Sequence, residues 1–280
     1  MSREQAVAAD ETGTIWQRSG LRRNLLERIG AGVLHVTEAL GHDAILLFNA
    51  ILWFRSIFRK LREVVRQMYL CGVMSFPVVV LVSIFAGAVL SLQAGLTLRT
   101  YGLQSKIGAI VAASMCREMG AIMTAIILAG RVGSAMAAEL GTMKVSEEID
   151  ALEAMSIDPV RFLVMPRLVA MLIMTPVLTM FSDLIGIVGG AMVAYHQIGV
   201  SYGAYYQEVW NVLVQLDVNS GLIKAFFFGT IIATVGCGCG LRAETSAEGV
   251  GKATKDSVVV SFILIIVFNY LITSIVRRFY

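Results

Sequence analysis

The sequence has few of the residues that build metal, redox or catalytic centres. Its histidines, His35, His42 and His196, are scattered, and it contains no H-E-x-x-H motif, so we expect no metal site. All four cysteines lie in apolar runs, and two of them, Cys237 and Cys239, are too close together for the usual zinc or redox pairs. The cysteines are therefore expected to be small packing residues.

A phosphate-binding loop is missing as well. The motif G-x-x-x-x-G-K-[ST] does not occur, and the nearest string, GVGKA at residues 249–253, lacks both the spacing and the hydroxyl residue. We therefore expect a chain that is not an enzyme, does not hydrolyse ATP by itself and holds no cofactor of its own.

Charge is also scarce, which places the chain in a membrane. Charged residues make up 15% of the sequence, hydrophobic residues make up 57%, and the mean hydropathy is +0.75; an average soluble domain has about 25% charged residues. The pattern predicts an all-α integral membrane protein. Five apolar segments are long enough to cross a bilayer, at about 68–96, 105–135, 162–195, 221–241 and 256–276.

Residues 21–62 contain no clean membrane span. Apolar residues repeat at helical spacing from Leu21 to Val33 beside several arginines, which is typical of a helix lying in the membrane interface. The run AILLFNAILWF at 44–54 is too short to span a bilayer. We interpret it as an elbow embedded in one leaflet.

The distribution of basic residues sets the orientation. With the N-terminus inside, seventeen Lys and Arg residues fall on the cytoplasmic side and five on the outer side, while Arg117 lies within a span. Because cytoplasmic loops carry the excess of basic residues, the N-terminus is predicted to be cytoplasmic. Residues 1–20 are polar and of mixed charge, without the apolar core of a signal peptide. They are expected to form a disordered cytoplasmic tail.

The most informative stretch is AGRVGSAMAAELGTMKVSEEIDALEAMSID at 129–158. Small residues recur every four positions in its first half, which allows close helix packing inside a bilayer. Six acidic residues then accompany a single lysine, Lys144, and charges of this kind are too costly to remain in hydrocarbon. The pattern predicts that a membrane helix ends here and that a charged helix over about 139–158 lies in the cytoplasm, where it offers a contact to a soluble partner.

Two adjacent charges lie inside the second span. Arg117 and Glu118 have about ten apolar residues on either side, and ionised groups at this depth normally need partners. Adjacent helical residues point about 100° apart, so each is expected to pair across helices or subunits. The pair is either a structural link within the bundle or a polar lining for an amphiphilic substrate. Arg66 and Lys252 are weaker candidates that could instead reach lipid headgroups.

Three segments carry a family resemblance: RQMYLCGVMSF at 66–76, REMGAIMTAIILAGRVGSAMAAELGTMKVSEEIDALEAMSIDPVRFLVMPRL at 117–168, and GVGKATKDSVV at 249–259. They resemble the MlaE-type permeases, membrane subunits of ABC transporters that move lipids together with MCE-domain proteins. The resemblance covers roughly residues 25–276. It implies a homodimer in the inner membrane of a Gram-negative bacterium, two cytoplasmic ATPase subunits that bind ATP and Mg, a periplasmic MCE protein and a glycerophospholipid substrate.

The resemblance also implies roles for particular residues. The matching segment in such permeases is a coupling helix that docks on the ATPase, which points here to Glu139, Lys144, Glu147, Glu148, Asp150, Leu152, Glu153 and Met155. The lipid pocket of such permeases lies near the positions matching Arg66, Arg117, Glu118 and Lys252. Relatives often have arginine where this chain has Lys252, and a lysine donates from a single point and not as a bidentate fork.

Two other functions compete with a lipid permease. A proton-driven secondary transporter would use Glu118 and Asp183 as a relay, but five spans give no repeated halves, and the acidic cytoplasmic segment would have no purpose. A non-transporting membrane scaffold for a periplasmic complex is the third possibility. The sequence contains no feature that indicates nucleic-acid binding.

Overall fold

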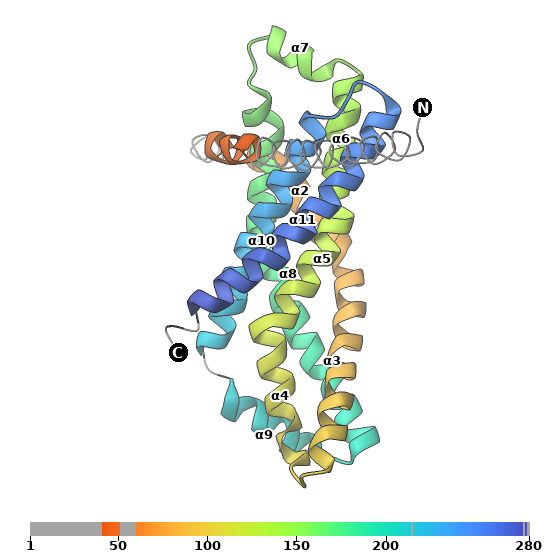
Figure 1. The fold of residues 1–280 in the computed structure, drawn as a ribbon, viewed down its shortest axis with the longest axis vertical. Coiled ribbons are helices and arrows are strands. Elements are labelled where there is room, and N and C mark those ends of the chain that lie inside the picture. Colours follow the sequence, from red (N-terminus) through yellow and green to blue (C-terminus); the bar gives the residue numbers. More distant parts are fainter. Residues whose placement is uncertain (1–40, 51–59, 214, 277, 279–280) are drawn as a thin grey trace, which may run out of the picture. The chain divides into compact units, whose positions relative to one another are not determined.

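The computed structural model describes residues 41–50, 60–213, 215–276 and 278. The chain divides into two units, Met1–Ile45 and Leu46–Tyr280, and the fold below is that of the second unit. In the described part of this unit the regular structure is helical, as predicted (Figure 1). The principal helices are α2 (Leu61–Cys71), α3 (Phe76–Arg99), α4 (Ile107–Ser114), α5 (Gly120–Leu128), α6 (Ser134–Val145), α7 (Glu148–Ala154), α8 (Met165–Val193), α9 (Tyr202–Val212), α10 (Gln215–Leu241) and α11 (Ala247–Val276).

Short helical turns join several of these helices into longer rods. They are η2 (Val73–Ser75), η3 (Gln104–Lys106), η4 (Met115–Met119), η5 (Ala129–Gly133), η6 (Val160–Val164) and η7 (Ala194–Ile198). The result is five helical stretches that are long and apolar enough to cross a membrane: Leu61–Arg99, Gln104–Val145, Val160–Ile198, Gln215–Leu241 and Ala247–Val276. The predicted number of membrane-spanning helices is confirmed, and each helical stretch is longer than its apolar run because the helix continues into polar sequence.

The helices pack closely because glycines remove side chains at the crossings. A Cβ atom on Gly87 of α3 would clash with the carbonyl oxygen of Gly186 on α8, and one on Gly189 would clash with that of Ile84. Close approach of backbones at small residues drives helix association in a bilayer. The α3–α8 contact therefore requires glycine at these positions.

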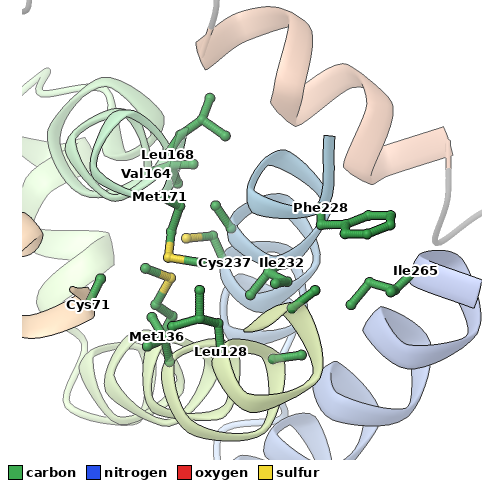
Figure 2. Close-up of a cluster of buried hydrophobic side chains, with 14 of the residues drawn as sticks. Cys71, Leu128, Met136, Val164, Leu168, Met171, Phe228, Ile232, Cys237 and Ile265 are labelled. Carbon is green, nitrogen blue, oxygen red and sulfur yellow. The ribbon is translucent and has the colours of Figure 1, made fainter. Parts of the chain in front are cut away.

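α10 lies at the centre of the fold, packed against α5, α6, α8 and α11. Around it is a core of buried apolar side chains, shown in Figure 2. α10 contributes Phe228, Ile232 and Cys237, the second span contributes Leu128 and Met136, α8 contributes Leu168 and Met171, and α2 and α11 contribute Cys71 and Ile265. All four cysteines of the chain are buried.

Two sets of contacts define the ends of the bundle. At the end that we call the α7 end, Lys144 of α6 donates to the carbonyl oxygen of Leu241 at the C-terminus of α10 (2.8 Å). At the opposite end, the α9 end, Lys106 of η3 binds Glu208 of α9 at 2.8 Å. The buried Tyr205 of α9 donates to the carbonyl oxygen of Ile187 on α8 (3.1 Å), and its burial raises the pKa of the phenol.

The predicted charged helix at 139–158 is divided in two. α6 continues the second span to Val145, the backbone takes a left-handed conformation at Glu147 (φ 58°), and the short helix α7 follows. A second left-handed residue, Ser156 (φ 58°), follows α7. Left-handed residues end helices, so α7 is a separate helix between two reversals of the chain and not a continuation of the span.

The predictions for the N-terminal region lie mostly outside the described residues. This applies to the tail at 1–20 and to the interfacial helix that begins at Leu21. Within the predicted elbow at 44–54, the described residues up to Ala50 are helical, and the remainder lies outside the described part of the chain.

Candidate functional site

The two charges inside the second span lie in a widened turn of the helix. Arg117 and Glu118 belong to η4, a π-helical turn between α4 and α5. Such turns occur frequently at functional sites, but η5, η6 and η7 of this chain are π-helical as well. Here the turn faces α10, and Gly221 of α10 has no room for a Cβ because the carbonyl oxygen of Cys116 occupies that place.

Arg117 forms a bidentate ion pair with Asp217 in the first turn of α10. Its Nε atom lies 2.7 Å from Oδ1, and its Nη2 atom lies 3.1 Å from Oδ2. Bidentate pairs of arginine and carboxylate are stronger and more directional than single contacts. The Asp217 side chain is fully buried, whereas the Arg117 side chain is 47% exposed. The guanidinium group therefore reaches the surface of the bundle while its partner lies inside.

Glu118 connects three helices. Its Oε1 atom accepts from Lys224 Nζ of α10 at 2.7 Å and from Thr273 Oγ1 of α11 at 2.9 Å, and its Oε2 atom accepts from Asn269 Nδ2 of α11 at 3.0 Å. Lys224 is 1% exposed and also donates to the carbonyl oxygen of Arg117 at 2.8 Å. An isolated charge in such surroundings would be very costly. The hydrogen bonds and opposite charges offset that cost.

We call these six residues the buried charge network: Arg117, Glu118, Asp217, Lys224, Asn269 and Thr273. Its two acids and two bases balance in charge, and its members come from η4, α10 and α11. Asp217 lies in the first turn of α10, and Thr273 lies in the last turn of α11. The network therefore lies where α10 begins and α11 ends.

The sequence predicted that Arg117 and Glu118 would each pair across helices, and the structure shows these partners. The sequence alone did not identify which residues these partners are. Lys224, one of the five basic residues counted on the outer side, is buried against Glu118. A usable signal was present, because Asp217 and Lys224 are seven residues apart and therefore share one face of a helix.

Asp183, the third acid within a span, is separate from this network. It is 7% exposed on α8, and its Oδ1 atom has no hydrogen-bond partner among the described residues. A Cβ atom on Gly120 would clash with that oxygen. No hydrogen bond joins Asp183 to Glu118 in the described part of the chain, so the structure provides no connection for the relay considered as an alternative.

The structure does not bring Arg66 and Lys252 to the network. Arg66 on α2 pairs with Glu63 at 3.6 Å, and Lys252 in the early part of α11 pairs with Glu244 at 3.5 Å. All four side chains are well exposed. Exposed pairs of this kind contribute little to stability, so both cations are available to a ligand or to lipid headgroups.

The predicted coupling residues fall into two groups. Those on α7 and at its ends are mostly exposed, whereas Ile149 is the buried residue of this helix. Glu147, Glu148, Asp150, Glu153 and Met155 are exposed and Leu152 is half-buried. None of these four acids forms an ion pair with a residue that the structure describes. By contrast, Glu139 binds Arg167 of α8 at 2.8 Å, and Lys144 binds the Leu241 carbonyl oxygen.

A comparison with known families identifies the family of the chain. The sequence profile described as "Permease MlaE" matches residues 64–275. The chain belongs to the MlaE permease family. The matched range contains all of the buried charge network, α7, and the greater part of every membrane-spanning stretch.

Individual MlaE-family relatives are similar over most of the chain. A probable ABC transporter permease protein of Rickettsia felis is 37% identical over 255 residues, which cover 90% of this chain and 97% of that protein. The intermembrane phospholipid transport system permease protein MlaE of Haemophilus influenzae is 34% identical over 253 residues, 90% of this chain and 97% of that protein. The chloroplastic protein trigalactosyldiacylglycerol 1 of Arabidopsis thaliana is 33% identical over 213 residues, 76% of this chain and 61% of that protein.

Proposed function

We propose that this chain is the permease subunit of an ABC transporter that moves glycerophospholipids between the bacterial inner membrane and periplasmic MCE-protein carriers. A separate cytoplasmic ATPase would drive the movement, and two copies of the chain would form a homodimer. The observation that carries the proposal is the MlaE family match over residues 64–275. The Haemophilus relative named for intermembrane phospholipid transport supports the substrate class.

The buried charge network supports a lipid route through the outer half of the bundle. A phospholipid needs apolar surface for its acyl chains and a cation for its phosphate. Arg117 offers a half-exposed guanidinium group on an apolar span, and arginine matches the geometry of phosphate. We propose that the headgroup passes Arg117 and Glu118, while Asp217 and Lys224 hold these two residues in position. Arg66 and Lys252 would contact headgroups at the α7 end.

The surface of α7 supports docking to the ATPase. Its exposed acids are joined by the exposed apolar side chain of Met155 (62% exposed). Opposite charges across an interface guide association and fix its register. We propose that Glu147, Glu148, Asp150, Glu153, Leu152 and Met155 enter a basic-rimmed groove of the ATPase subunit.

A reconstitution experiment tests the proposal. The chain is co-expressed with its ATPase subunit, purified and placed in proteoliposomes containing a fluorescent phospholipid and a soluble MCE-protein partner. We expect the ATPase and phospholipid to co-purify with the chain, and lipid exchange with the MCE protein to require ATP hydrolysis. Failure of the ATPase to co-purify, or exchange at the same rate with a non-hydrolysable analogue, contradicts the proposed function.

The Glu147→Lys, Glu148→Lys double variant tests the docking surface. Reversing both charges should release the ATPase and leave the permease folded. The matched control is Glu244→Lys, Glu248→Lys, which makes the same charge change at exposed positions beside α10 and α11 at the same end. Retention of the ATPase by the α7 variant, or its equal loss from the control, contradicts the assignment of α7.

A further inference from the structure

The base of the α7 excursion contains a buried arginine that the sequence did not single out. Arg167, near the start of α8, is 3% exposed, and its Nη2 atom lies 2.8 Å from Oε2 of Glu139 on α6. Its Nη1 atom donates to the carbonyl oxygen of Leu163 at 3.2 Å, and its Nε atom has no partner among the described residues. The Glu139 side chain is 57% exposed, so the acid reaches from the surface to an otherwise buried cation.

This ion pair closes the segment that carries α7. The chain leaves α6 after Val145, reverses at Glu147 and forms α7. It reverses again at Ser156 and returns through η6 into α8. In Figure 1, α7 lies beyond the ends of α6 and α8. Glu139, on the α6 side, and Arg167, on the α8 side, lie at the base of this segment and bind each other. We call these two sides the feet of the segment.

The two feet contact partly different helices, although both contact α10 and share one apolar core cluster. α6 packs mainly against α10 and α11, whereas α8 packs against α2, α3 and α10. Each foot also has its own fastening. On the α6 side, Lys144 binds the Leu241 carbonyl oxygen (2.8 Å). On the η6 side, Lys60 donates to the carbonyl oxygen of Arg161 (3.4 Å) and lies 3.9 Å from the centre of the Phe162 ring. Of these fastenings, the Glu139–Arg167 pair is the one that joins the feet to each other.

Electrostatics favour a closed base. Lys60, which precedes α2, contacts Arg161 of the η6 foot, and burial, followed by the charge of Arg161, lowers the pKa of Lys60. Separation of Glu139 from Arg167 would leave the buried guanidinium group without its counter-charge. A buried charge that loses its partner is strongly destabilising. A force on α7 therefore moves α6 and α8 together more readily than it spreads them.

We propose that Arg167, held by Glu139, is a positioning residue that makes the two feet of the α7 excursion move as one body. When the ATPase displaces α7, α8 and α10 then move together, because the two sides of the segment that carries α7 do not separate. The proposal deepens the proposed function and rests on it. It also gives Glu139 a role within the permease in place of contact with the ATPase.

The coupling test uses Glu139→Gln in the full reconstituted complex, because this change removes the charge and keeps the shape of the side chain, and a size-exclusion profile checks that the variant remains folded. We expect the ATPase to stay bound and to hydrolyse ATP, while the number of lipids moved per ATP falls at least about fivefold, the lower end of typical coupling between sites. The double variant Glu139→Arg, Arg167→Glu should restore most of the ratio. Glu244→Gln, which breaks an exposed pair at the same end, is the matched control. An unchanged ratio, or release of the ATPase by Glu139→Gln, overturns the proposal.

A second measurement separates this proposal from the proposed function. Spin labels at Val145 and Ile157, which are 39% and 36% exposed, report the separation of the two feet without the ATPase. We expect a narrow distance distribution in the otherwise unaltered chain and a broad one with Glu139→Gln. Distance distributions of equal width overturn the proposed role of the Glu139–Arg167 pair. If the distances change as expected but the chain neither binds an ATPase nor moves lipid, the proposed function is overturned. The role of the Glu139–Arg167 pair in holding the two feet together would then still hold.

Discussion

Acidic residues occur in two regions of this molecule under opposite conditions. In the buried charge network, Glu118 and Asp217 are each held by a cation, and hydrogen-bond donors from α11 complete the coordination of Glu118. On α7, Glu147, Glu148 and Asp150 face outward. Within the part of the chain that the structure describes, no cation pairs with them. The first arrangement satisfies its charges internally, and the second leaves them to a partner.

The difference separates a residue's importance for folding from its importance for function. A buried acid whose partners lie on other helices cannot change without disturbing the bundle. An exposed acid can change with little effect on the fold, yet a partner that reads its charge will no longer bind. Measurements of unfolding and of binding should therefore rank the two regions in opposite orders.

Reversal of the central acid should have the largest effect on stability. In Glu118→Arg, a new cation faces Lys224, and the contacts from Asn269 and Thr273 to the carboxylate are lost. We expect a loss of about 3–5 kcal/mol in the free energy of unfolding, typical of an uncompensated buried charge, together with loss of lipid transport. Unfolding by SDS in mixed micelles measures the first quantity. The swap Glu118→Lys, Lys224→Glu should recover part of it, and a fully stable Glu118→Arg protein would contradict the account of the network.

The pair between Arg117 and Asp217 should be asymmetric, since one side chain is half-exposed and the other is fully buried. Arg117→Ala removes the bidentate partner of a buried carboxylate and should cost about 3 kcal/mol. Asp217→Asn keeps a polar group in place while the guanidinium group turns toward the surface, and should cost about 1–2 kcal/mol. The same SDS titration compares them, and a larger cost for Asp217→Asn would show that the buried partner does not depend on Arg117.

A single hydrogen bond from α11 should matter less. Thr273→Val keeps the shape of the side chain and removes one of the donors to Glu118. We expect a loss of about 1 kcal/mol, the usual contribution of one hydrogen bond, with transport retained. Thr254→Val is the matched control on the same helix, because among the described residues that hydroxyl bonds only the carbonyl oxygen of Val250 within the helix. Equal costs at both positions would mean that the contact with Glu118 adds nothing.

The smallest effect on stability should come from α7. The Glu147→Lys, Glu148→Lys variant should unfold within about 0.5 kcal/mol of the unaltered protein, as expected for exposed substitutions, although it no longer retains the ATPase. Unfolding and co-purification on the same preparation test this separation. A large loss of stability would show that these acids have a structural role like those of the network.

The sequence predicted the fold well, because a bilayer leaves few alternatives. Five apolar runs gave five spans, and the acidic segment after 139 marked where the second span leaves the apolar region. The ends were less predictable, since α10 begins at Gln215 and α11 at Ala247, where polar residues extend helices whose apolar parts alone are visible in a hydropathy pattern. The break at Glu147 depends on a single left-handed residue, which no composition indicates.

The site was predictable in its centre and not in its surroundings. Two charges among apolar residues identified Arg117 and Glu118 directly. Their partners are about 100 and 150 positions away along the chain, and only the packing of α10 and α11 brings them together. Glu139 shows a further contact that the sequence did not indicate, because its place in an acidic segment predicted an external contact, and the structure also pairs its carboxylate with Arg167.

In the proposed orientation, the α7 end faces a cytoplasmic ATPase and the α9 end faces the periplasm. Single cysteines at Met155 and Lys252 report the first end and one at Tyr101 the second, since these side chains are well exposed. The background is a chain without its four buried cysteines. A membrane-impermeant maleimide applied to intact spheroplasts should label position 101 and should reach positions 155 and 252 only after lysis. Labelling of position 155 from the periplasmic side would contradict the orientation, the ATPase contact and the transport function together.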